Sequence, residues 1–98
     1  CREVMLDFYA DWCVSCKEME RFTFGDPKVQ ARLKDVVLLQ ADVTAINPDD
    51  KALLKRFNLF GPPGIIFWNA DGNESPYKVI GYEPPEKFLA SVTAALGR

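Results

Sequence analysis

The 98-residue chain has a net charge of −2, and its 48% hydrophobic and 27% charged residues are those of an ordinary soluble globular domain. Its twelve basic residues form no block and are outnumbered by fourteen acidic ones, which excludes nucleic acid as an expected partner. The longest apolar runs, residues 36–39 and 65–68, are far shorter than the roughly 20 residues that cross a bilayer. Residues 1–98 therefore predict one domain that does not itself span a membrane.

The first half of the chain predicts a strand–helix–strand unit. Residues 3–9 form a short apolar run typical of a strand buried on both faces. Helical signals follow over residues 13–24, and an Asp-Pro pair predicts a second short helix over residues 26–34. The β-branched run at residues 36–42 predicts the next strand. Such a unit makes the two strands parallel, with a right-handed crossover.

The second half of the chain predicts a helix, a hairpin and a last helix. Residues 47–57 begin with an Asn-Pro pair that caps a helix with one apolar face. Gly and Pro residues at 61–64 break the chain, and residues 65–69 and 78–82 flank an Asp-Gly turn as an antiparallel hairpin. The last helix is predicted over residues 84–96. The predicted order is βα(α)βαββα, an α/β fold whose mixed central sheet is flanked by helices.

Two cysteines, Cys13 and Cys16, stand three residues apart at the start of the first predicted helix. At this spacing they can form a disulfide with only small backbone adjustment. The helix N-terminus favours a thiolate at Cys13, so we expect Cys13 to face solvent and attack first, and Cys16 to resolve the mixed disulfide. Thiol–disulfide exchange needs no other cofactor, so the redox-active disulfide Cys13–Cys16 is the only one predicted.

Two other interpretations of the cysteine pair stay open at this point. A structural zinc site needs four ligands, but the chain has no histidine and only Cys1 as a further cysteine, so we predict no metal. Two buried structural thiols are the other interpretation. We assign Cys1 no function, because a lipid attached there would lie only two residues from a core strand.

Residues 7–17, Asp-Phe-Tyr-Ala-Asp-Trp-Cys-Val-Ser-Cys-Lys, resemble the active-site strand and helix of the thioredoxin superfamily. Pro63, some 47 residues beyond Cys16 and just before a predicted strand, is similar to the cis-proline of that superfamily. The resemblance covers nearly the whole chain. It implies a thioredoxin-like fold that starts at the usual second strand and lacks the first strand and helix.

Positions that are less distinctive than the cysteine pair indicate a family within that superfamily. They are Val-Ser at 14–15, Glu18, Glu20 and the segments 23–29 and 37–44. With them the chain resembles the C-terminal thioredoxin-like domain of the membrane thiol:disulfide interchange protein DsbD. The resemblance implies a domain of a larger membrane protein, tethered to the bacterial inner membrane and facing the periplasm. It implies electron transfer from the transmembrane domain to the N-terminal domain of the same protein, and from there to disulfide isomerases and cytochrome c maturation proteins.

Three residues near the pair are candidates for a role in exchange. Asp7 matches the buried aspartate of thioredoxin and could relay the proton that Cys16 must lose, or it is merely satisfied by backbone or water. Glu20, four residues after Cys16, matches an acidic residue near the active site of the DsbD family, or it is a solvated helix residue. Trp12 could shield the disulfide and meet the partner protein, or it simply packs.

Pro62 and Pro63 are candidates for a substrate-binding loop. Only about 5–6% of X–Pro bonds in folded proteins are cis, but the resemblance implies a cis Pro62–Pro63 bond beside the cysteines. Such a loop would present its backbone to an incoming peptide. Two departures from the family bear on this mode of binding, because Pro62 has no N–H to offer and Gly64 replaces the common Thr.

The sequence thus predicts a protein-disulfide reductase that relays electrons from a membrane-embedded partner to protein disulfides in the periplasm. A free-standing general thioredoxin-like reductase is the first alternative. A thioredoxin-fold binding module without catalytic activity is the second. We expect a monomer whose partners are protein disulfides and dithiols.

Overall fold

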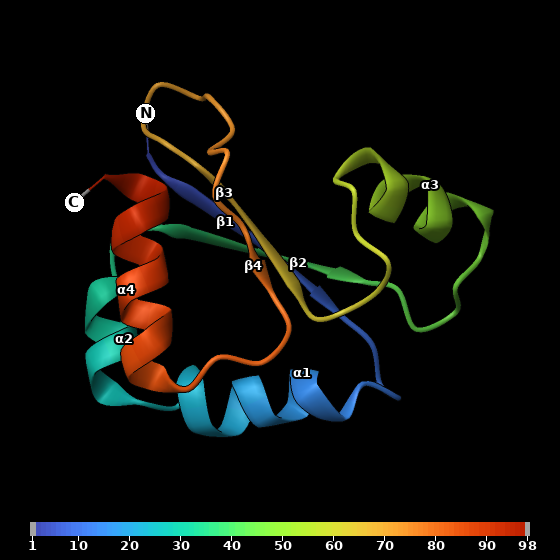
Figure 1. Ribbon diagram of the computed structural model, residues 1–98, viewed down its shortest axis with the longest axis horizontal. Coiled ribbons are helices and arrows are strands. Elements are labelled where there is room, and N and C mark those ends of the chain that lie inside the picture. The colour runs from blue at the N-terminus through green and yellow to red at the C-terminus, as the bar shows by residue number, and fades with distance from the viewer. Residues whose placement is uncertain (1, 98) are drawn as a thin grey trace.

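The computed structural model describes residues 2–97, so Cys1 lies outside the described residues. The elements follow one another in the predicted order, with the bounds β1 Val4–Tyr9, α1 Val14–Glu18, η1 Met19–Thr23, α2 Pro27–Arg32, β2 Val37–Asp42, α3 Pro48–Arg56, β3 Gly64–Trp68, β4 Val79–Ile80 and α4 Pro85–Leu96. Within residues 2–97 the strands form a four-stranded mixed sheet in the order β2-β1-β3-β4 (Figure 1). The predicted α/β architecture is confirmed.

Strand β1 lies inside the sheet, and its pairing decides which segments meet at one edge. It runs parallel to β2, with Val4 opposite Val37, and antiparallel to β3, with Phe8 opposite Gly64. The carboxyl ends of β1 and β2 therefore lie at the same edge as the amino end of β3. The segments that follow β1 and precede β3 carry the cysteines and the prolines, so this edge collects the candidate site.

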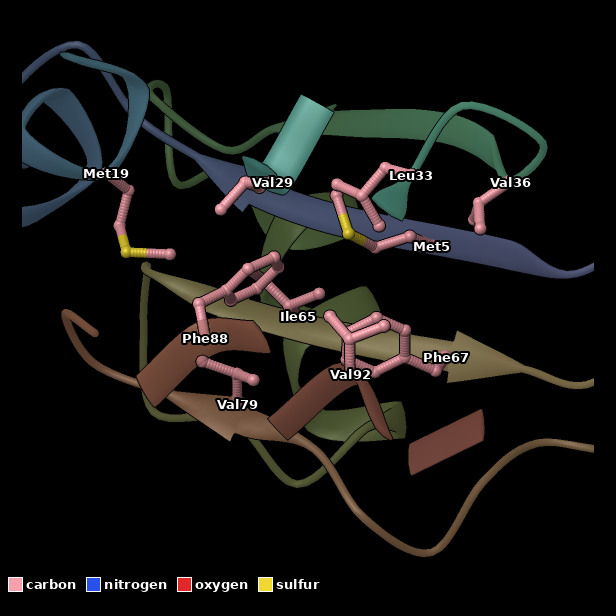
Figure 2. Packing of buried hydrophobic residues seen from close by; sticks show 10 residues of the cluster. All are labelled: Met5, Met19, Val29, Leu33, Val36, Ile65, Phe67, Val79, Phe88 and Val92. Atoms are coloured by element: carbon pink, nitrogen blue, oxygen red, sulfur yellow. The ribbon is translucent and has the colours of Figure 1, made fainter. Parts of the chain in front are cut away.

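Helices cover both faces of the sheet and divide the core into two clusters. Helices α2 and α4 lie on one side of the strands and α3 lies on the other (Figure 1). Met5 packs in the first cluster with Phe88 and Val92 of α4 (Figure 2). Phe8 packs in the second cluster with Leu54 of α3. Successive side chains of a strand point to opposite faces, so β1 contributes to both clusters.

The first predicted helix changes its geometry halfway. Helix α1 ends at Glu18 and continues as the π-helix η1, after which the Phe24 N–H donates to the Met19 carbonyl at 2.7 Å. The hydroxyl of Thr23, which is completely buried, donates to the Glu83 carbonyl oxygen at 2.5 Å. This hydrogen bond connects the π-helix η1 to a segment 60 residues further along the chain.

The two outer strands of the sheet have distinct features: β4 is short, and β2 has exposed apolar side chains. Strand β4 has two residues instead of the predicted five, because the backbone turns at Gly81, whose φ is 85°. At the other side, Leu38 and Leu39 of β2, the outer strand among residues 2–97, are 55% and 50% exposed. None of the helices within residues 2–97 has the length and apolar character needed to cross a membrane.

Candidate active site

A tight connection joins strand β1 to the cysteine pair. Only residues 10–12 separate the end of β1 from Cys13, which is the N-cap of α1. The Cys13 N–H donates to the Ala10 carbonyl at 3.0 Å, and Ala10 is completely buried. The chain therefore turns immediately after β1 and begins α1 with Cys13 at the edge of the sheet.

Cys13 and Cys16 form a disulfide, with their Cα atoms 5.2 Å apart. The Cys16 N–H donates to the Cys13 sulfur at 3.1 Å, so the start of the helix already directs a backbone dipole at that atom. The Cys16 sulfur lies 3.8 Å from the Phe8 carbonyl oxygen of β1. Cys13 thus has a donor beside it, and Cys16 has an acceptor for its thiol proton in the reduced form.

The prediction that Cys13 faces solvent is wrong. Cys13 is 6% exposed, almost as little as Cys16 at 4%. Both belong to the apolar cluster on the α3 side of the sheet, together with Phe57 and Leu59 from the loop that precedes β3. Long-range packing of that loop, which spacing along the sequence does not reveal, covers the first cysteine as well as the second.

Trp12 is held beside the disulfide by the loop that follows β2. Its indole N–H donates to the Thr44 carbonyl at 3.0 Å, while the Asp11 N–H donates to the Thr44 hydroxyl at 2.9 Å. The hydroxyl and backbone N–H of Thr44 donate in turn to Asp42 and hold the pKa of that carboxyl below its ordinary value. Trp12 remains 52% exposed, so it offers a positioned aromatic surface next to Cys13.

The proline loop enters β3 at the same edge. The Pro62–Pro63 bond is cis, as predicted, and the Pro63 carbonyl accepts from the Gly81 N–H at 3.1 Å. Because Gly64 pairs with Phe8, Pro63 lies where β1 ends and the turn to Cys13 begins. A Cβ atom on Gly64 would come within 2.8 Å of a methyl carbon of Leu59, so glycine lets Leu59 pack directly on the backbone.

Asp7 is half-buried and titrates far from its ordinary range. The pKa of its carboxyl is raised to about 7, mainly by burial and also by the negative charge of Glu20, while a hydrogen bond with the Gln40 side chain opposes both. Gln40 lies opposite Asp7 in the pairing of β1 with β2. The carboxyl is therefore close to half ionised at neutral pH and can accept or release a proton there.

Glu20 itself is an exposed residue of η1 and acts on the site through its charge. The structure thus couples Asp7 to Glu20, and it places the cysteines, Trp12 and Pro63 at one edge. Sequence reasoning missed Gln40 and Thr44, since both act across the β1–β2 pairing, whose register no local pattern indicates. Among residues 2–97, no three His, Cys, Asp or Glu side chains are grouped as metal ligands.

Comparison with known proteins gives consistent matches over more than nine tenths of the chain. A family model described as a thioredoxin-like domain matches residues 2–96. The thiol:disulfide interchange protein DsbD of Ralstonia nicotianae is 69% identical over 96 residues, covering 98% of this chain and 16% of that protein. DsbD of Escherichia coli K12 is 53% identical over 90 residues, covering 91% of this chain and 16% of that protein. The chain therefore spans about a sixth of the length of these relatives.

Solved structures agree with these matches. The C-terminal domain of Neisseria meningitidis DsbD in its oxidised form is 41% identical, with a TM-score of 0.82, over 96% of this chain and 80% of that chain. A thioredoxin from Thermus thermophilus is 25% identical, with a TM-score of 0.75, over 95% of this chain and 76% of that chain.

The raised pKa of Asp7 predicts a pH-dependent gain in stability when the carboxyl is removed. The folded protein holds the Asp7 proton more tightly than the unfolded chain, so stability falls as pH rises from about 4 through about 7. Asp7→Asn should therefore leave the oxidised protein nearly unchanged at pH 4 and stabilise it at pH 8, by roughly 1 to 4 kcal/mol. Urea unfolding of both proteins at the two pH values measures the difference.

Asp35→Asn provides the matched control, because Asp35 is an exposed aspartate outside the site. That substitution should change stability little at either pH. An Asp7→Asn protein with the same gain at pH 4 and pH 8, or with a loss at pH 8, would contradict the explanation.

Proposed function

This chain belongs to the thioredoxin-like domain family, in the branch of the DsbD C-terminal domains, and we propose that it relays electrons by dithiol–disulfide exchange. In this proposal it accepts them from a membrane-embedded dithiol partner and reduces protein disulfides in the periplasm. The observation that carries the proposal is the Cys13–Cys16 disulfide at the start of α1, beside the cis Pro62–Pro63 bond.

The exchange moves two electrons and two protons in balanced steps. A thiolate of the donor attacks the Cys13 sulfur, the Cys13–Cys16 bond breaks, and Cys16 leaves as a thiolate that takes up a proton. The second thiol of the donor then attacks the donor's first sulfur in the mixed disulfide. The donor leaves as a disulfide, and Cys13 and Cys16 are released in the dithiol form. In the next stage the Cys13 thiolate attacks a target disulfide, and the Cys16 thiolate then attacks the Cys13 sulfur. The Cys13–Cys16 disulfide forms again, and the target is released as a dithiol.

The different surroundings of the two sulfurs favour different roles for Cys13 and Cys16. Cys13 is the attacking group because it caps the helix and receives the Cys16 N–H, which stabilises negative charge. Cys16 is the resolving group because its sulfur lies against the Phe8 carbonyl, one helical turn after Cys13. Trp12 and the prolines frame the approach of a target peptide, for which Pro62 can supply a carbonyl acceptor but no N–H donor.

Asp7 serves this proposal as the proton relay for Cys16. Its carboxyl, with a pKa of about 7, lies on the residue next to Phe8, whose carbonyl Cys16 approaches. An acid of that strength gives up and recovers a proton with little cost at neutral pH. Glu20 tunes the same carboxyl through its charge.

A free-standing general reductase is a second candidate, favoured by the structural likeness to the Thermus thermophilus thioredoxin. The two functions differ in their reactivity towards unrelated protein disulfides. A relay that serves dedicated partners should reduce insulin much more slowly than thioredoxin does, whereas a general reductase should match it.

The assignment of the two cysteines predicts different failures of two variants. Cys13→Ser should lose all reduction of insulin disulfides above background, because no attacking thiol remains. Cys16→Ser should attack insulin but fail to resolve the product, and so accumulate a mixed disulfide through Cys13. Non-reducing electrophoresis and mass spectrometry identify that product. Reduction of insulin by Cys13→Ser at the wild-type rate would refute the mechanism.

The electrostatics predict that Cys13 is a weaker acid than the attacking cysteine of thioredoxin. The helix N-terminus favours the thiolate by about 0.3–1 kcal/mol, up to about 2 when partly buried. Burial of Cys13 and the negative charges of Asp7 and Glu20 oppose it, and the chain has no histidine to compensate. In the reduced protein we expect Cys13 to stay mostly protonated at neutral pH, so that it reacts slowly until a partner docks.

A pH titration of the Cys13 alkylation rate tests this expectation in four proteins, the wild type and three variants. Asp7→Asn and Glu20→Gln should each lower the apparent pKa of Cys13, by roughly 0.5 to 1 unit, because each removes a negative charge. Asp35→Asn, with the same loss of charge on an exposed residue outside the site, is the control and should leave it unchanged. A wild-type thiol titrating well below 7, or no downward shift in either variant, would disprove the idea.

A further inference from the structure

An open groove of about 470 Å³ lies between α3 and the loop that leads to the prolines. Its apolar lining consists of Leu54, Leu59, Phe60 and Ile46, the last from the loop before α3. Lys51 and Lys55, both exposed, contribute its polar lining. The mechanism of exchange uses none of these side chains, so the groove needs an explanation of its own.

The groove shares its apolar residues with the cluster that holds the disulfide. Leu54 and Leu59 pack in the same cluster as Cys13 and Cys16. Leu59 also rests on Gly64, next to the cis-proline, where any larger residue would meet it. A molecule in the groove therefore contacts the far side of the same cluster that covers the reactive sulfurs.

Two apolar side chains at the groove, Phe60 and Ile46, are exposed to solvent, which indicates a surface for a binding partner. Phe60 is fully exposed, although it lies one residue beyond the buried Leu59. Ile46 is 42% exposed and has a φ of 47°, a left-handed conformation that is an outlier for a β-branched residue. Exposed aromatic residues next to a pocket are typical of protein–protein contacts.

The charged residues of the groove indicate the kind of partner that would bind there. Lys51 and Lys55 are four residues apart and lie on one face of α3. Within residues 2–97, neither ammonium group has a carboxylate at ion-pair distance. Among the residues that the structure describes, the groove lining contains no acidic one, whereas exposed acids and bases are mixed over residues 17–21 on the helix side of the disulfide. An acidic segment is therefore attracted to the groove.

We propose that this groove docks an extended segment of the protein whose disulfide is exchanged, with one apolar side chain against Leu54, Leu59 and Phe60. Carboxylates of that segment pair with Lys51 and Lys55. The inference rests on the proposed function and adds to it the chemistry of the partner: apolar and acidic residues near the reactive cysteine. Docking there directs the partner's sulfur towards Cys13.

Synthetic peptides provide the test. Each peptide carries one cysteine activated as a mixed disulfide with thionitrobenzoate, followed by an acidic-leucine, a basic-leucine or an acidic-serine sequence. The Cys13 thiolate of the reduced chain attacks the peptide sulfur, and thionitrobenzoate leaves as a coloured thiolate. Its release gives the second-order rate constant for each peptide. The uncharged reagent 4,4′-dithiodipyridine, too small to use the groove, reports the reactivity of Cys13 alone.

We expect the acidic-leucine peptide to react about tenfold faster than either other peptide at low salt, relative to dithiodipyridine. Lys51→Glu/Lys55→Glu should reverse the preference between acidic and basic peptides. Phe60→Ser should remove the advantage of leucine over serine. Lys28→Glu/Lys34→Glu makes the same charge change on the α2 side of the molecule and should keep the wild-type preference.

Equal rates for all three peptides, or an unchanged preference in both groove variants, would overturn the docking proposal while leaving exchange intact. A concentration-dependent dimer that Phe60→Ser dissolves would assign the groove to a second copy and would also overturn it. Failure of the reduced wild-type chain to react even with dithiodipyridine would instead refute the proposed function.

Discussion

The hydrogen bond from the Cys13 N–H to the Ala10 carbonyl sets the position of everything at the site. It closes the short connection after β1, so α1 must start at the edge where the central strand ends. Parallel pairing with β2 brings Thr44 to that edge, and antiparallel pairing with β3 brings Pro63 there. A longer or looser connection would separate the sulfurs from both neighbouring loops.

The same strand also carries the ionisable carboxyl of Asp7, at a cost in stability. Asp7 occupies a half-buried position on β1, where an apolar residue would stabilise the fold more. Burial and the charge of Glu20 keep its carboxyl near its point of half ionisation at neutral pH. A carboxyl maintained under such conditions is typical of a functional site rather than of a structural one.

Local patterns predicted much of this structure because they depend on neighbouring residues. Asp26 caps α2 and Asn47 caps α3, as expected from an acceptor side chain before proline. The Cys-x-x-Cys spacing predicted the disulfide, and the resemblance to thioredoxin predicted the cis bond at Pro63. The order of helices and strands followed from the same short-range signals.

Features that depend on residues distant in sequence could not be predicted in this way. The burial of Cys13 depends on Leu59, and the π-helix is fastened by Glu83. The effect of Gln40 on Asp7 requires the register between two strands. In each case the physical cause is a contact across the fold, which the spacing of residues along the chain does not encode.

The central claim is that the charge of the Asp7 carboxyl is coupled to the ionisation of Cys13 in the reduced protein. The most direct measurement is the ¹³C chemical shift of the Asp7 carboxyl carbon as a function of pH, in the oxidised and the reduced protein. The account predicts a pKa near 7 in the oxidised form and, in the reduced form, a second inflection at higher pH, where Cys13 ionises near the charged carboxylate. A value near 4 in the oxidised protein, or identical titration curves in both forms, would contradict it.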